Sequence, residues 1–146
     1  MQRRIKERAD KSKVVLPDIT FEKKHVIELG GWRIEALNLG PAHSPGDTMV
    51  WLPKQRLVIA GDMAFHQRLL PIFDHTNTKG WIKTWDNFEA LGATVVIPGH
   101  GVPTTYPTVR KFTRDYLVYL RGKIRKLIDA GGTLQESYKV DQSPYA

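Results

Sequence analysis

Residues 36–62 read ALNLGPAHSPGDTMVWLPKQRLVIAGD, and this stretch decides the fold of the chain. An apolar strand leads into a turn that carries His43, a second strand follows over 48–52, and a third over 56–60 leads to Asp62. Runs of β-branched and apolar residues bounded by Gly and Pro are typical of strands and turns. Because both polar residues follow strands, we expect a site at the edge of a sheet.

The residues before this stretch predict further antiparallel strands. Strands are expected near 19–22, 25–30 and 32–38, and Gly30-Gly31 predicts a hairpin turn between the last two. The connection between 48–52 and 56–60 is also short enough for a hairpin. The first half of the chain is therefore interpreted as an antiparallel meander.

The second half adds helices and one more strand. Apolar residues at helical spacing predict helices over 78–91 and 107–130, and a short apolar strand over 94–97 leads to His100. The weakly periodic segment 63–77 is interpreted as a loop that crosses the mouth of the site. The expected fold class is α/β, with a mostly antiparallel sheet covered by helices on one face.

Length and composition favour one small domain. The chain has 146 residues, of which 41% are hydrophobic, so one core is expected, with 14–146 as the domain and 1–13 as a basic arm that is frayed or disordered. There is no cysteine, which excludes disulfides and thiolate metal ligands. The sequence contains no long apolar run and no secretory signal, so no membrane partner is expected and the location is taken as cytoplasmic by default.

The basic excess raises the question of nucleic acid. The net charge is +7, and residues 106–126 hold seven basic residues and one acidic residue. Such charge favours binding to nucleic acid or to anionic surfaces. No nucleic-acid motif or aromatic interleaving accompanies it, so a solvated helix face is the preferred interpretation.

Three polar residues form the candidate site. His43, Asp62 and His100 each follow a predicted strand and lie beside glycine or proline. Two imidazoles and one carboxylate suit zinc, iron or manganese. The same residues could equally stabilise turns through hydrogen bonds. His66 and His75, both in the loop 63–77, are candidates for a replacement ligand.

Three ordered motifs resemble those of the metallo-β-lactamase superfamily: Gly40–Thr48, Val58–Asp62 and Val95–Gly101. The resemblance implies that His43 ligates a first metal, that Asp62 bridges two metals, and that His100 ligates the second. It also implies half of an αββα sandwich. Members of the superfamily attack esters, thioesters, lactones, amides or phosphodiesters with a metal-bound hydroxide, and Asp62 would therefore be the catalytic residue.

The chain departs from the family pattern in one respect. The His-x-His-x-Asp-His motif, which supplies the remaining ligands, is absent, so only the C-terminal half is matched and each metal would keep two protein ligands. Metal is therefore expected to be weakly bound or absent in the isolated chain. An aspartate at position 62, where the antibiotic-degrading lactamases have cysteine, favours ester, thioester or lactone substrates over β-lactams.

Two functions follow from this half match. One is a hydrolase completed by a second copy of the chain or by a separate N-terminal half. The other is a non-catalytic, truncated remnant that acts as a self-associating structural or interaction domain. The apolar sheet face that the missing half would cover predicts a homodimer. This face is drawn from Trp32, Ile34, Leu37, Val50, Leu52, Val58 and Val96, according to the side each one faces.

Overall fold

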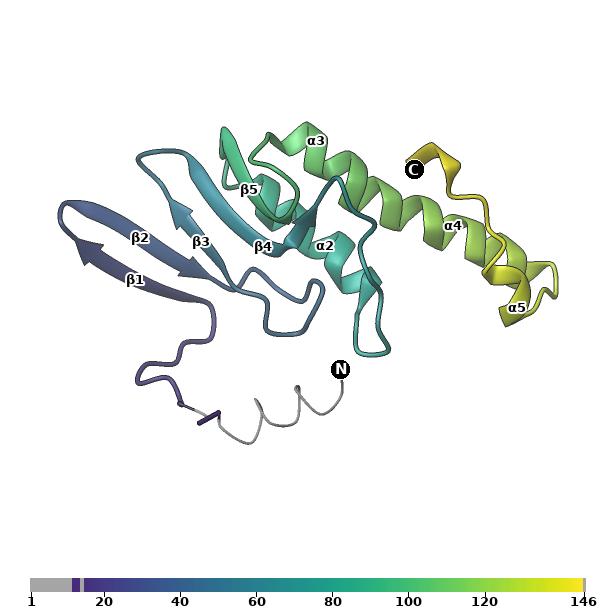
Figure 1. Cartoon of the computed structure of the whole chain (residues 1–146), viewed down its shortest axis with the longest axis horizontal. Coiled ribbons are helices and arrows are strands. Elements are labelled where there is room, and N and C mark those ends of the chain that lie inside the picture. Colours follow the sequence, from purple (N-terminus) through teal and green to yellow (C-terminus); the bar gives the residue numbers. More distant parts are fainter. Residues whose placement is uncertain (1–11, 14, 146) are drawn as a thin grey trace.

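The computed structural model describes residues 12, 13 and 15–145 (Figure 1). Its sheet has five strands in the order β1-β2-β3-β4-β5. The expected basic arm 1–13 lies almost entirely outside the described residues. The strands are β1 (Lys24–Leu29), β2 (Trp32–Leu37), β3 (Met49–Leu52), β4 (Leu57–Phe65) and β5 (Val95–His100).

Strands β1 to β4 form the antiparallel meander that the sequence predicts, and β5 pairs with β4 in parallel. The first hairpin closes at the pair Leu29↔Trp32. Its turn residues Gly30 and Gly31 have φ angles of 56° and 79°, the left-handed values that a tight hairpin turn of this kind requires. The Gly-Gly prediction is confirmed.

Three strand predictions differ from the structure. The strand expected over 19–22 does not form, since residues 15–23 are described without strand structure and Ile19 is exposed. Strand β1 is therefore the edge strand, and this segment lies outside the sheet. Strand β4 runs past residue 60 to Phe65 and β5 runs past residue 97 to His100, because the two strands pair at Gly61↔Pro98 and Phe65↔His100.

The helices follow the expected pattern. Helix α2 covers Thr78–Glu89, and its N-cap residue Asn77 accepts a hydrogen bond from the Gly80 amide at 2.8 Å. The long second helix consists of α3 (Tyr106–Arg110), the π-helical turn η1 (Lys111–Asp115) and α4 (Tyr116–Asp129). Two short elements complete the chain, α5 (Leu134–Ser137) and the 3₁₀ turn η2 (Ser143–Tyr145).

The core lies between the helices and one face of the sheet. Alternate residues of the inner strands are buried there, while Trp81, Trp85 and Phe88 of α2 fill the space from the helical side. The sheet residues of this core are Leu37, Met49, Trp51, Val58, Ala60 and Val96. The prediction that helices cover one face is therefore confirmed (Figure 1).

The π-helical turn ties the long helix to the end of β4. The hydroxyl of Thr113 accepts a hydrogen bond from the Phe65 amide at 2.8 Å and donates one to the Phe65 carbonyl at 3.0 Å. Both residues are fully buried. A π turn inserts one extra residue into a helix, and here that insertion accompanies the contact of Thr113 with the strand that carries Asp62.

No helix in the described part of the chain is both long enough and apolar enough to cross a membrane.

Candidate metal-type site at the β4–β5 edge

An irregular stretch of β4 places the Asp62 carboxylate beside β5. The β4–β5 register shifts between Ile59 and Gly61 and again between Gly61 and Phe65, and Gly61 has a φ of 53°. Asp62 therefore lies within a bulged strand and not beyond a strand end. A side chain at Gly99 would collide with the Asp62 carboxylate and would lie 2.7 Å from the Gly61 backbone. Glycine at position 99 is what allows this close approach.

The structure brings Asp62 and His100 together. Asp62 Oδ1 lies 3.7 Å from His100 Nε2, and both side chains are about one-third exposed. One guanidinium nitrogen of Arg68 lies 3.2 Å from His100 Nδ1 and 3.4 Å from His100 Nε2. The imidazole therefore has both a carboxylate and a permanent cation as neighbours.

His43 lies outside this pair, in the loop between β2 and β3. The loop is held by Asp47, whose carboxylate accepts hydrogen bonds from the Ser44 amide at 2.8 Å and the Ser44 hydroxyl at 2.7 Å. The Nδ1 atom of His43 is buried and has no hydrogen-bond partner among the residues that the structure describes. A buried polar atom of this kind is uncommon, which makes His43 a residue of interest.

The ring of Phe65 contacts both candidate histidines. Its centroid lies 6.0 Å from that of His43 and 5.0 Å from that of His100. The ring centroid of His43 also lies 5.4 Å from that of Phe73 and 5.9 Å from that of Trp81. The surroundings of His43 are thus aromatic, whereas those of His100 are charged.

The two loop histidines have different surroundings. His66 is buried, and its Nε2 lies 2.7 Å from the Val102 carbonyl oxygen, while its amide donates to the His100 carbonyl at 3.1 Å. His75 is exposed and its ring centroid lies 6.5 Å from that of His43. His66 therefore supports the loops around His100, and a ligand role for either residue stays a prediction.

The described residues do not by themselves fit a metal ion. No group of three or more His, Cys, Asp or Glu side chains in residues 12–13 and 15–145 is placed to hold one. Asp62 and His100 offer two donors, and the Arg68 cation lies against both nitrogens of the imidazole. Zinc sites in proteins have three or four protein ligands. The joint assignment of His43, Asp62 and His100 as metal ligands stays a prediction.

Sequence reasoning missed Arg68 as a site residue. It lies in a segment of poor periodicity and reaches His100 from 32 positions away. No local signal marked it, because a single arginine in a loop is ordinary surface composition.

Comparison with known proteins establishes the family. The sequence profile described as the metallo-beta-lactamase superfamily matches residues 2–100. This chain belongs to the metallo-β-lactamase superfamily. The linear primary-alkylsulfatase of Pseudomonas sp. (strain ATCC 19151) is 24% identical over 134 residues, which are 86% of this chain and 25% of the relative. The metallo-beta-lactamase type 2 of Bacteroides fragilis is 28% identical over 90 residues, 59% of this chain and 36% of the relative.

Solved structures agree with the assignment. A metallo-beta-lactamase from Pontibacter korlensis superposes with a TM-score of 0.64 and 25% identity, over 77% of this chain and 53% of the other. This superfamily member thus spans about half of that lactamase and only 25% of the alkylsulfatase. Members of the superfamily are typically metal-dependent, and this chain is a hydrolase-like domain of that superfamily.

Proposed function

We propose that this superfamily member is a hydrolase domain for esters, thioesters or lactones whose metal site is completed by a second copy of the chain. The observation that supports this most directly is the Asp62–His100 pair, 3.7 Å apart, held by the bulged β4 strand and the Gly99 approach. When bound, a metal would supply the activated water of the reaction. The chain's own contribution is a carboxylate and an imidazole in fixed positions, with His43 as the third candidate.

The second copy is proposed to dock on the open face of the sheet, defined as the face opposite the helices. The strand registers align Ile27 with Ile34, Leu29 with Trp32, Val50 with Ile59, Leu52 with Leu57, and Ile59 with Ile97 on this face. Exposed members of the open face include Ile27, Leu29, Trp32, Ile59 and Val95. Soluble monomers seldom expose large contiguous apolar patches.

The first hairpin indicates which of its two faces is the docking face. Lys24, Glu28, Arg33 and Glu35 lie on the helix side of the hairpin, where Arg33 contacts Glu28 at 2.8 Å and Glu35 at 2.9 Å. The other side carries only apolar residues and the half-buried His25. A hairpin with water on both faces would not be stabilised by having its charged residues on one face and its apolar residues on the other. A twofold, self-complementary contact is the simplest cover for an apolar face.

Metal binding tests the site. The purified chain is stripped with chelator, incubated with zinc, iron(II) or manganese, desalted and assayed by metal analysis, alongside Asp62→Ala and the neighbouring control Thr48→Ala. We expect metal retention that depends on protein concentration and is lost in Asp62→Ala only. Retention that is equal in both variants, or none at any concentration, would overturn the metal assignment.

Activity tests the reaction class. The metal-treated chain is assayed with an aryl ester, a thioester, a lactone, an alkyl sulfate and a β-lactam. The alkyl sulfate is included because a relative carries that activity in its name. We expect turnover of the aryl ester, the thioester or the lactone, at a rate that rises with the fraction of dimer. Turnover of the β-lactam alone would contradict the proposal.

The second candidate is a non-catalytic, self-associating domain. The Arg68 guanidinium against both nitrogens of His100 favours it, because this cation opposes a metal at that ring. One experiment distinguishes the two candidate functions. A stable dimer without metal retention or turnover supports the remnant, whereas metal and turnover in the dimer support the enzyme.

A further inference from the structure

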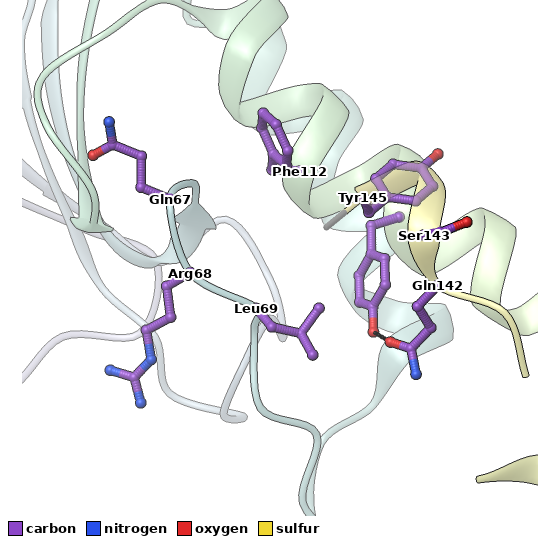
Figure 2. A pocket seen from close by; sticks show the side chains of 8 residues that line it. Gln67, Arg68, Leu69, Phe112, Gln142, Ser143 and Tyr145 are labelled. Atoms are coloured by element: carbon purple, nitrogen blue, oxygen red, sulfur yellow. Dashed lines mark hydrogen bonds between the residues drawn. The ribbon is translucent and has the colours of Figure 1, made fainter. Parts of the chain in front are cut away.

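A cavity lies beside the candidate site. Its volume is about 650 Å³, and it lies between the loop after β4, the long helix and the C-terminal turn η2 (Figure 2). Cavities of roughly 300–1,000 Å³ are typical of small-ligand sites. Its lining residues are Gln67, Arg68, Leu69, Phe112, Tyr116, Gln142, Ser143 and Tyr145.

Both walls of the cavity are held by specific contacts. On the C-terminal side, the Tyr116 hydroxyl donates to Gln142 Oε1 at 2.6 Å, and the Tyr145 ring packs on Tyr116 with centroids 5.4 Å apart. On the loop side, Gln67 Oε1 accepts a hydrogen bond from the Val102 amide at 3.3 Å. The cavity therefore exists before any ligand enters, which limits the ordering cost of binding.

The lining is mostly apolar and carries one cation. Leu69, Phe112, Tyr116 and Tyr145 present apolar or aromatic surface, and none of the lining residues is acidic. Nearby Asp115 forms ion pairs with Arg110 at 3.6 Å and with Arg114 at 3.5 Å, so these two cations balance its negative charge. The Lys111 ammonium lies 5.0 Å from the Phe112 ring and adds positive charge near the cavity. An apolar body with a negative end matches this distribution.

One loop connects the cavity to the candidate site. In Figure 2 the Leu69 side chain points toward the C-terminal wall, whereas the Arg68 side chain points away from it. The Arg68 guanidinium reaches His100 at 3.2 Å. A ligand lying across residues 68–69 would place its chain beside Leu69 and its head group beside the Arg68 guanidinium, which contacts His100.

We infer that this cavity binds the hydrocarbon chain of an amphiphile whose anionic head group contacts Arg68. The inference rests on the proposed function: hydrolysis of a long-chain ester at the same site would release a carboxylate amphiphile of this kind, so long-chain esters become the substrate class. It also assigns Arg68 a binding role that neither motif nor spacing indicated.

Calorimetric titration of the full chain with dodecanoate, below its micelle concentration, tests the inference. Ser143→Trp places an indole in the cavity from η2, and Gln135→Trp adds the same group on α5 as a matched control. We expect Ser143→Trp to weaken dodecanoate binding by about tenfold or more, while Gln135→Trp leaves it unchanged. Leu69→Asp, on the opposite wall, should give the same loss by charge repulsion.

The head-group contact has its own measurement. Arg68→Gln should weaken dodecanoate binding by about tenfold, since charge-assisted hydrogen bonds are lost, and leave decanol binding unchanged. Equal weakening of both ligands would overturn the contact. Unchanged dodecanoate binding in Ser143→Trp, together with its loss in Trp32→Ser, would place the ligand on the open sheet face and overturn the inference.

The inference and the proposed function fail in different ways. Dodecanoate binding that is sensitive to Ser143→Trp, without turnover of any ester, supports the cavity and refutes the hydrolase. Ester turnover that is indifferent to Ser143→Trp and to chain length supports the hydrolase and refutes the cavity.

Discussion

The two faces of the same sheet differ sharply in how they are covered. Val58 and Val96, on the helix-covered face, are 0% exposed, whereas their strand neighbours Ile59 and Val95, on the open face, are 42% and 37% exposed. These residues are chemically alike and differ in position by one. Since side chains alternate across a strand, the sequence supplies two apolar faces, and this chain covers one of them.

Among the sheet residues, hydrophobicity therefore does not determine burial. On the covered face the apolar residues hold the fold together. On the open face they are exposed although Arg33 and its acidic partners show that the other side of the same hairpin is polar. We attribute this asymmetry to association.

The largest effect is expected in the covered core. Trp85→Ala removes a fully buried indole that packs on Phe88 with ring centroids 5.1 Å apart. The unfolding free energy should fall by about 3–5 kcal/mol, because transfer and cavity terms add. Chemical denaturation of the variant measures this. Trp32→Ala, the same substitution on the open face, should change the unfolding free energy of the monomer far less, and a loss of equal size would contradict the contrast.

The second largest effect is expected on the association of two chains into the dimer. Trp32→Glu places a charge on the open face at the turn end of the first hairpin, where it would be buried unpaired in the dimer. The dimer dissociation constant should rise about 100-fold, as for a tryptophan that contributes strongly to an interface. Sedimentation at micromolar concentration measures it.

Arg33 provides the matched control, because it follows Trp32 directly and faces the other side of the hairpin. Arg33→Ala should leave the association constant unchanged, as its ion pairs are exposed and weak. A wild-type chain that sediments as a monomer and binds no hydrophobic dye would refute the assembly model.

A smaller effect is expected where the long helix is tied to the sheet. Thr113→Val leaves the buried amide and carbonyl of Phe65 without their partner. The unfolding free energy should fall by about 1–3 kcal/mol, the cost of such unsatisfied groups. Thr113→Ser keeps the hydroxyl and should recover most of the loss. A Thr113→Val variant that is as stable as the wild-type chain would show that these hydrogen bonds do not contribute to stability.

The smallest effect is expected at α5, outside the covered core. Hydrogen bonds from the amide and hydroxyl of Thr133 lower the pKa of Glu136 below its ordinary value of 4.5. A lowered folded-state pKa means that the stabilisation of α5 is present above pH 4.5 and is lost as the pH falls through the lowered value. Titration by NMR should show this midpoint, and Thr133→Ala should return it to the ordinary range while the Trp85 core stays folded.

Much of this fold was predictable from local signals. The Gly30-Gly31 turn, the alternating strands and the helical spacing of Trp81, Trp85 and Phe88 each arise within a few residues. Local periodicity determines which side of each element is apolar. The order of the three motifs identified the superfamily for the same reason, since each motif lies on one strand and the turn that follows it.

The site depended on contacts between distant segments. The parallel pairing of β4 with β5 extended β4 to Phe65 and put Asp62 within a bulged strand, and Gly99 permitted the approach to His100. The register of two strands more than thirty residues apart is set by the packing of the whole sheet, so no local pattern could specify it.

The sequence alone therefore determined the elements, their apolar faces and the superfamily, because these follow from spacing along the chain. Only the tertiary structure decided that Arg68 lies against His100, that Phe65 contacts the rings of both His43 and His100, and that one apolar face stays open. These outcomes depend on which surfaces meet in space. The chain encodes them through long-range packing, which is visible only after folding.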